Sequence, residues 1–591
     1  MVGTWFLRLW RKCGGGGGAL PAAARNAEAR ARPALTRDSP ARQRPTGILG
    51  RPLCGVAVRI LLPFATLSLA VGLACGASAQ DANLPDIGSS AGELIDPSLE
   101  AQYGAYTLYE LRRLGLVLDD PLVDDWLHAM GFRLAAASET PRQSFTFFMM
   151  RDRQINAFAT LGGYIGMNAG LVITAETEAE VAGVMAHEIA HVSQRHVLRA
   201  VERAKKDQIP ILLAMVGAIA ASQAAGSSSA ESNNSSSNAT AAAITGAMAL
   251  MAQRQIDYTR SNESEADRVG IQTLARSGYE PNGMADFFER MQKANRGNSG
   301  GYQLPEYLRS HPVTTTRISE TRQRAQKLVA ERPAPSATSR APASLLLPRD
   351  YSLAGDTGAG LGENFGWVRE RLRVLSANDP AVALREYRAL ARAPGARTSD
   401  AQRYGLALAQ MRGGYPAEAQ ATLDDLLLRH PQHLWLLLAR AEAAAISGRK
   451  ALAGERFDEL LARHPDSRAV RLTYAQALGE VSTPASGRRA QEVLRPLLAS
   501  SAEDPLFQRS FARASELAGD IVRAGEAYAE TAYLNGRAVD ALNQLAGLMK
   551  RTDLDYYQRA RIEARMAAIT PVVLEMQRQG IRPEEQRPDR Q

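Results

Sequence analysis

Apolar and polar positions alternate with helical period between residues 177 and 203. Apolar residues recur on one face there: Val181, Val184, Met185 and Val192. Thr177, followed three residues later by Glu180, has the form of a capping box. Because neither Pro nor Gly interrupts the chain from Val184 to Arg203, the pattern predicts one helix about five turns long.

The same reading predicts mixed secondary structure across residues 80–330. Helical patterns run over Pro97–Leu114 and Pro121–Ala137, and another opens at Ser261 and continues to Gly278. Short apolar runs predict three strands: Ser144–Met150, Asn156–Phe158 and Tyr164–Met167, the last two around a Gly162-Gly163 turn. We therefore expect an α+β domain that is mostly helical, with a small sheet whose edge strand could pair with a peptide.

Residues 366–577 read as helices that repeat. Arg429-His430-Pro431 recurs 34 residues later as Arg463-His464-Pro465. Three further pairs share this period: Gly414 with Gly448, Ala419 with Ala453, and Leu423 with Phe457. This is the period of tetratricopeptide repeats, which predicts an all-α solenoid with a concave surface for peptides or partner proteins. Pro505, Gly519 and Ala527 indicate further repeats, with an insertion near 482–487, and the repeat histidines are expected to be structural.

Three segments read as connections or inserts. Residues 331–365, rich in Pro, Ala, Ser and Gly, predict a linker between the domains, and 578–591 a tail. Two apolar arms, Ile209–Ala221 and Ala239–Met251, flank a Ser/Asn-rich stretch, and each arm is too short to span a membrane. This insert, 209–251, predicts a helical hairpin that packs near or over the cleft, or else makes a peripheral membrane or partner contact.

The nominal net charge of +8 comes from the first 79 residues. They hold 11 Lys/Arg against 2 Asp/Glu, which leaves 59 basic and 60 acidic residues in the remainder. We therefore expect no nucleic-acid partner. An apolar run from Ile60 to Ala74 and the sequence Ala77-Ser78-Ala79 before Gln80 predict a secretory signal within a 1–79 leader, and residues 1–50 read as an over-extended start.

The cysteines fit this leader. All three, Cys13, Cys54 and Cys75, precede the predicted cleavage site, so the mature chain would carry no thiol and would suit an oxidising periplasm. Lipidation at Cys75 is the weaker alternative, because the large apolar residue of a lipoprotein signal sits one position late.

The chemistry-bearing motif lies within the helix predicted at 177–203. His187-Glu188-Ile189-Ala190-His191 is an H-E-x-x-H pattern, which places two imidazoles on one helical face. Such a pair can bind one Zn²⁺, with Glu188 positioned to accept a proton from the attacking water. A buried helix with two incidental histidines is the competing explanation, but the polar context disfavours it.

A catalytic zinc needs a third protein ligand. The metzincin pattern would require a histidine at position 197 and a glycine at 194, where this chain has Val197 and Gln194. His196 is one residue out of phase and reads as a surface or packing residue. The acidic start of the helix at 261–278 offers the alternative. There Glu263 could bind the metal, Asp267 could hold the free N–H of a ligand histidine, and Glu265 would point into solvent.

These residues together resemble the gluzincin peptidases related to the CAAX prenyl protease, in their soluble bacterial branch. The resemblance runs over roughly residues 84–577 and rests on five further segments: Leu84–Ser90, Ile155–Ala159, Gly162–Ile165, Ser310-His311-Pro312 and Arg317. Thr160-Leu161 stands where the family has Leu-Pro, which should make that turn less rigid.

The resemblance implies a zincin-type fold and one Zn²⁺ per subunit, held by His187, His191 and Glu263. It also implies that His311 lies near the zinc, with Arg317 as a structural or polarising partner. His311, in a loop before Pro312, could either occupy the open metal position and keep the enzyme latent, or donate a hydrogen bond to the oxyanion during catalysis.

The implied function is that of a periplasmic zinc endopeptidase. Its clients would be misassembled outer-membrane beta-barrel proteins, and the repeats would bind these clients or the assembly machinery. A chaperone or scaffold with conditional, latent proteolysis is the alternative. A membrane-embedded prenyl-protein protease is excluded, since the mature chain lacks long apolar spans.

Overall fold

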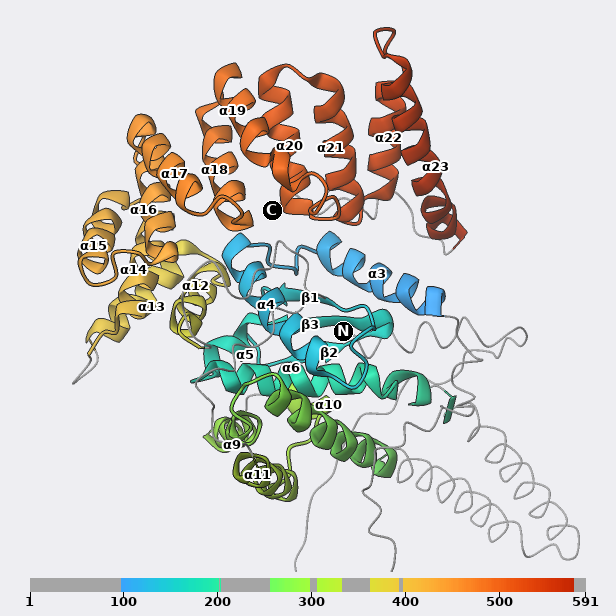
Figure 1. Cartoon of the computed structure of the whole chain (residues 1–591), viewed down its shortest axis with the longest axis vertical. Helices are drawn as coiled ribbons and strands as arrows, with labels where there is room; N and C mark the ends of the chain where they lie inside the picture. Colours follow the sequence, from blue (N-terminus) through green and yellow to red (C-terminus); the bar gives the residue numbers. More distant parts are fainter. Residues whose placement is uncertain are drawn as a thin grey trace, which may run out of the picture. The chain divides into compact units, whose positions relative to one another are not determined.

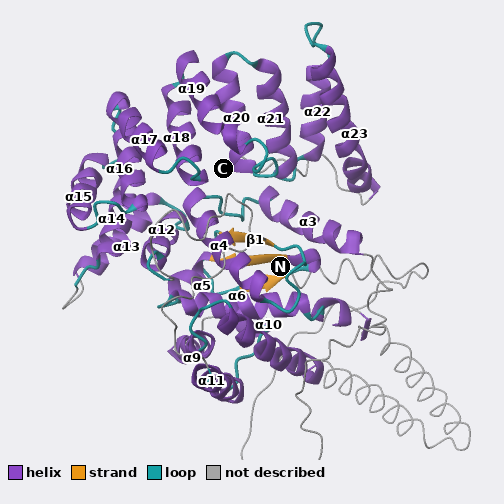
Figure 2. Cartoon of the chain, viewed as in Figure 1, coloured by secondary structure: helices purple, strands orange, loops and turns teal. Residues whose placement is uncertain are grey.

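The computed structural model describes residues 97–200, 202–203, 256–297, 306–331, 362–392 and 397–578. All of them belong to one compact unit, Pro85–Gln591. The predictions for the 1–79 leader, the 209–251 insert and most of the 331–365 linker lie outside the described residues. Within the described part of the chain, helices predominate and the strands form one small sheet (Figures 1 and 2).

The N-terminal half contains the mixed α+β elements that the sequence predicts. In chain order they are α3 (Pro97–Arg113), α4 (Pro121–Ala137), β1 (Thr146–Met150), β2 (Ala157–Ala159), the 3-10 helix η1 (Leu161–Gly163), β3 (Tyr164–Asn168), α5 (Ala169–Thr174), α6 (Glu178–Ser193), helical residues 196–200 and 256–276, α9 (Asn282–Gly297), α10 (Glu306–Ser310) and α11 (Thr315–Ala330). The predicted helices α3 and α4 and the three strands are confirmed, with their ends shifted by at most two residues, whereas the helix predicted from Ser261 to Gly278 is already helical at residue 256 and ends at residue 276.

The sheet has the order β1-β3-β2, so β2 is an edge strand. β1 pairs with β3 in parallel, and β2 pairs with β3 in antiparallel fashion. The turn before β3 uses positive φ at both Gly162 and Gly163, and a Cβ on Gly163 would lie only 2.1 Å from the carbonyl oxygen of Ser144. Two glycines therefore form this turn without the family's proline.

Helix α6 begins where the capping pattern predicts but ends earlier. The Thr177 hydroxyl accepts a hydrogen bond from the backbone N–H of Glu180, while the Glu180 carboxylate binds Arg290 instead of closing the box. The expected five-turn helix to Arg203 is wrong. It stops at Ser193 because Arg195 adopts a left-handed conformation with φ 53°, and helical geometry resumes at residue 196.

The C-terminal half is entirely helical within its described residues. Its elements are α12 (Phe365–Leu375), α13 (Pro380–Arg392), α14 (Asp400–Arg412), α15 (Pro416–Arg429), α16 (Leu434–Ile446), α17 (Lys450–Arg463), α18 (Arg468–Val481), α19 (Pro484–Leu494), the 3-10 helix η2 (Arg495–Leu497), α20 (Pro505–Ala518), α21 (Ile521–Leu534), α22 (Ala538–Met549) and α23 (Tyr556–Arg578). Helices α15 and α17 have equal length and start 34 residues apart, as the sequence period requires.

Buried apolar residues of both halves form one continuous core. It runs from α4 and the sheet through α12 to α18 and α19. The halves are also joined by charge, because Arg371 on α12 donates two 2.7 Å hydrogen bonds to Asp120, the N-cap of α4. Among the described residues, no helix combines the length and apolar character needed to cross a bilayer.

Candidate metal centre

Two helices approach closely to form the centre. The helix at 256–276 lies against α6, and Gly270 faces the backbone of His187. A Cβ at Gly270 would lie 3.1 Å from the backbone of His187, so a larger residue would push the helices apart. Small buried residues, Ala190 and Ala266, complete the contact. This close approach carries Glu263 and Asp267 to the H-E-x-x-H motif.

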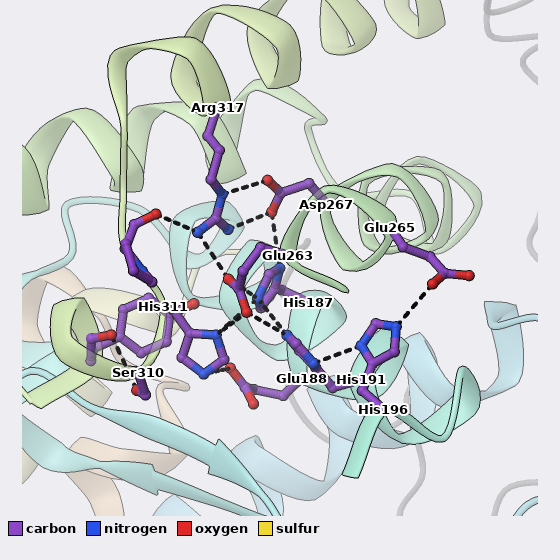
Figure 3. Close-up of polar contacts among 12 residues, drawn as sticks. His187, Glu188, His191, His196, Glu263, Glu265, Asp267, Ser310, His311 and Arg317 are labelled. Atoms are coloured by element: carbon purple, nitrogen blue, oxygen red, sulfur yellow. Dashed lines mark hydrogen bonds and ion pairs between the residues drawn. The ribbon is translucent and has the colours of Figure 1, made fainter. Parts of the chain in front are cut away.

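Four side chains place one ligand atom each within 4.8 Å of one another: His187, His191, Glu263 and His311 (Figure 3). The Nε2 atoms of His187 and His191 are 3.0 Å apart. Glu263 lies 3.5 Å from His187 Nε2 through Oε2 and 3.3 Å from His191 Nε2 through Oε1. Nδ1 of His311 lies 2.9 Å from Glu263 Oε1 and 3.4 Å from His187 Nε2.

These separations fit a tetrahedral metal ion. Ligand atoms at about 2.0–2.1 Å from a zinc ion lie about 3.3–3.4 Å from one another at the corners of a tetrahedron. The five separations given above, from 2.9 to 3.5 Å, lie around that value, and the four ligand atoms as a set lie within 4.8 Å of one another. Three imidazoles and one carboxylate are also donors that suit zinc. The residues present therefore fit a bound metal ion.

An arginine and an aspartate brace this centre from behind. Arg317 donates two 2.8 Å hydrogen bonds to Asp267, and its Nη1 lies 2.9 Å from Glu263 Oε2. Asp267 in turn lies 3.0 Å from His187 Nδ1, so that the opposite nitrogen of this ring, Nε2, faces the other donors. Burial opposes the charge on Asp267, but His187 and Arg317 hold its pKa below the usual range.

Glu188 lies beside the donor set and is almost fully buried. Burial raises the pKa of its carboxyl above the ordinary value. Its Oε1 lies 3.8 Å from His311 Nε2 and accepts no hydrogen bond from the described residues. A buried carboxylate with a raised pKa and an uncommitted oxygen can both accept and return a proton, as a general base and acid must.

Tyr307 on α10 sets the position of His311. The two rings stack with centroids 4.7 Å apart, and Tyr307 is fully buried. The backbone N–H of His311 also donates a 2.7 Å hydrogen bond to the carbonyl of Tyr307. The histidine is therefore held by packing and by its main chain, rather than lying on a free surface loop.

His196 and Glu265 make contacts in the structure that the sequence does not predict. His196, expected on the surface or in simple packing, is buried, with its Nδ1 2.8 Å from His191 Nδ1. Glu265, expected in solvent, lies 3.1 Å from His196 Nε2 and receives a 2.6 Å hydrogen bond from Arg199. The assignment of His196 assumed an unbroken α6. The positive φ of Arg195 changes the direction of the chain, and no local sequence signal marked that break.

The fold and this site define a metallopeptidase, and comparison with known proteins supports that class. Residues 121–325 match the model of peptidase family M48, a span that contains His187, Glu188, His191, Glu263, Asp267, His311 and Arg317. Residues 121–325 are thus similar to this family, and the chain is a metalloendopeptidase.

The relatives extend the likeness to most of the chain. The beta-barrel assembly-enhancing proteases of Escherichia coli K12 and Yersinia pestis are each 29% identical, over 500 and 485 residues. These matches cover 84% and 82% of this chain and 94% and 90% of the relatives. A Vibrio cholerae protein that bears this name provisionally is 41% identical over 248 residues, which is 41% of this chain and only 48% of that relative. The chain thus resembles the beta-barrel assembly-enhancing proteases.

The structure brings together every residue that the sequence and the resemblance assigned to the site. His187, His191 and Glu263 converge with His311, and Asp267 and Arg317 stand behind them. The edge strand β2 packs beside α6.

Proposed function

We propose that this protein is a zinc endopeptidase that hydrolyses peptide bonds in the bacterial periplasm. The observation that carries the proposal is the convergence of four donor atoms beside a buried, uncommitted carboxylate oxygen. His187, His191 and Glu263 would hold the ion. Zinc, when bound, supplies a Lewis acid that makes water more acidic and polarises the peptide carbonyl.

The remaining chemistry belongs to the chain. Glu188 accepts the proton of the attacking water and returns it to the leaving amine, which its raised pKa favours. Asp267 holds His187 with Nε2 facing the other donors, and Arg317 fixes Asp267 and neutralises part of the acidic pair. The exposed edge of β2 offers main-chain groups to an extended substrate, which favours broad side-chain selectivity.

His311 is best explained as a latency ligand. Its Nδ1 lies within the donor set, 2.9 Å from Glu263, at the position that a water molecule and a substrate carbonyl would need. A histidine that only stabilised the oxyanion would stand beside this set and not within it. Substrate access would then require the loop after α10 to move, so that clients or partners release the activity.

The names of the relatives point to the clients. We propose that misassembled outer-membrane beta-barrel proteins are the substrates. The helices of residues 366–577 would act as tetratricopeptide repeats that bind clients or the assembly machinery. The 34-residue spacing of α15 and α17 supports the repeat assignment, and the predicted secretory signal supports the location. Latent activity also accommodates a chaperone-like role between cleavage events.

The test is casein cleavage and zinc content, measured on the mature chain and on Glu188→Gln. The wild type should carry one zinc per chain and lose activity on chelation. Glu188→Gln should keep its zinc and lose turnover by about 10²–10⁴-fold, the usual contribution of a general base. Normal cleavage by Glu188→Gln, or a wild type that binds no zinc, would contradict the proposal.

A further inference from the structure

The two histidines of the motif have different partners behind them. Nδ1 of His187 faces a carboxylate, that of Asp267, at 3.0 Å. Nδ1 of His191 faces another imidazole, that of His196, at 2.8 Å. Behind His196 stands Glu265, at 3.1 Å (Figure 3). Arg199 donates a hydrogen bond to Glu265. One ligand is therefore supported directly by an acid, and the other through an additional ring.

The break in α6 creates this second arrangement. On a continuous helix, residues five apart lie about 140° apart around the axis and cannot touch through their side chains. The left-handed residue Arg195 ends the helix and redirects the chain, so that the His196 ring meets the His191 ring with centroids 4.7 Å apart. The Arg195 side chain forms an ion pair with Glu100 on α3, which anchors the turn to a distant element.

Hydrogen-bond logic fixes the protons along this chain of groups. The carboxylate of Glu265 can only accept, so His196 must donate to it through Nε2–H. A neutral His196 then has a bare Nδ1, which can only accept a hydrogen bond. His191 must therefore donate through Nδ1–H, and its lone pair is left on Nε2, the atom that faces His187 and Glu263.

We propose that Glu265 and His196 form a positioning relay that orients His191 and fixes the tautomer in which its Nε2 binds the metal. The proposal rests on the zinc site proposed above. Burial supports it, since His196 is only 3% exposed and no described group other than His191 and Glu265 is recorded at its two ring nitrogens. Partners of this kind typically contribute a factor of 10–100 to metal affinity.

The test is zinc affinity by competition with a chelator, on the full mature chain. His196→Leu removes the acceptor and should weaken zinc binding about tenfold or more. His196→Asn keeps a carbonyl oxygen near the place of Nδ1 and should restore most of that loss. The zinc affinity of Glu265→Gln should lie between those of His196→Leu and His196→Asn. Glu289→Gln is the matched control, because Glu289 also pairs with an arginine, Arg322, at 2.6 Å but lies outside the centre.

A spectrum separates positioning from mere packing. With Co²⁺ in place of zinc, the visible absorption bands report ligand geometry, and they should change in His196→Leu and Glu265→Gln but not in Glu289→Gln. Equal losses of zinc affinity in His196→Leu and His196→Asn would overturn the relay. So would wild-type zinc affinities in Glu265→Gln and His196→Asn together with an unfolded His196→Leu protein. A wild type that binds no zinc would instead refute the proposed function.

Discussion

Two buried clusters of charged and ligand-type side chains in this protein differ in how their groups are paired. In the metal centre, four donor atoms point toward one another, and only Glu263 among them is also paired with an arginine. At the junction between the two halves, which we call the junction cluster, two arginines face carboxylates, and Arg371 also donates a hydrogen bond to the Tyr404 hydroxyl. Arg371 binds Asp120 in bidentate fashion, and Arg468 contacts the following acids: Asp124, Asp125 and Asp504.

The difference shows how to tell a functional buried cluster from a structural one. In the junction cluster, the carboxylates lie 2.6–3.8 Å from an arginine, so positive charge already faces the acids. In the metal centre, donors face donors, an arrangement that is unfavourable unless a cation lies between them. Convergent lone pairs, rather than burial or charge alone, therefore identify the metal site.

The largest expected effect comes from removing a ligand. Glu263→Gln replaces a carboxylate with a weakly coordinating amide, and zinc affinity should fall by more than about a hundredfold, beyond the range of an outer partner. The junction variant Asp120→Asn, measured in the same chelator competition, should keep wild-type affinity. Equal zinc affinities in Glu263→Gln and Asp120→Asn would contradict the assignment of one cluster to metal binding and the other to structure.

Breaking the junction should instead affect stability. Asp120→Asn leaves the buried Arg371 without its anionic partner and should lower the free energy of unfolding by about 3–5 kcal/mol in denaturant titrations. The double variant with Arg371→Met removes the stranded cation as well and should recover part of that loss. If the double variant is less stable than Asp120→Asn alone, the Asp120–Arg371 pair contributes more to the free energy of unfolding than the neutralisation of two buried charges.

Acid should weaken the same junction through His128 on α4. Burial, with Arg468 as a smaller contribution, lowers the pKa of His128 to about 4. Between pH 6.5 and pH 4 the unfolded chain therefore binds a proton that the folded chain does not, and stability falls as pH falls. From pH 7 to pH 5 this loss is about 2 kcal/mol. His128→Gln should show a correspondingly shallower pH dependence of unfolding.

The smallest effect concerns latency. His311→Ala removes the fourth donor, and casein cleavage should rise a few-fold because substrate no longer competes with an internal ligand. Zinc content should stay near one per chain, since His187, His191 and Glu263 remain. Slower cleavage with intact zinc would mean that His311 takes part in the reaction itself, and latency would then have to reside elsewhere in the chain.

Much of the fold followed from local pattern. The bounds of α4 agree with the prediction, and those of α3, β1 and β3 differ by one to two residues, because periodicity and capping act over a few positions. The prediction failed where a single residue, Arg195, took a left-handed conformation. No local sequence signal marks that conformation, and the Arg195 side chain pairs with Glu100, 95 residues away, in the folded chain.

The sequence by itself determined the two candidate ligands that share one helix. Residues four apart on α6 must face the same way, so His187, Glu188 and His191 were readable from spacing alone. Only the tertiary structure decided what meets them. Glu263 arrives because Gly270 permits close helix contact, His311 arrives from a loop 124 residues away, and His196 arrives through a broken helix. Helix geometry is fixed by local bonds, whereas these approaches depend on packing that no short stretch of sequence encodes.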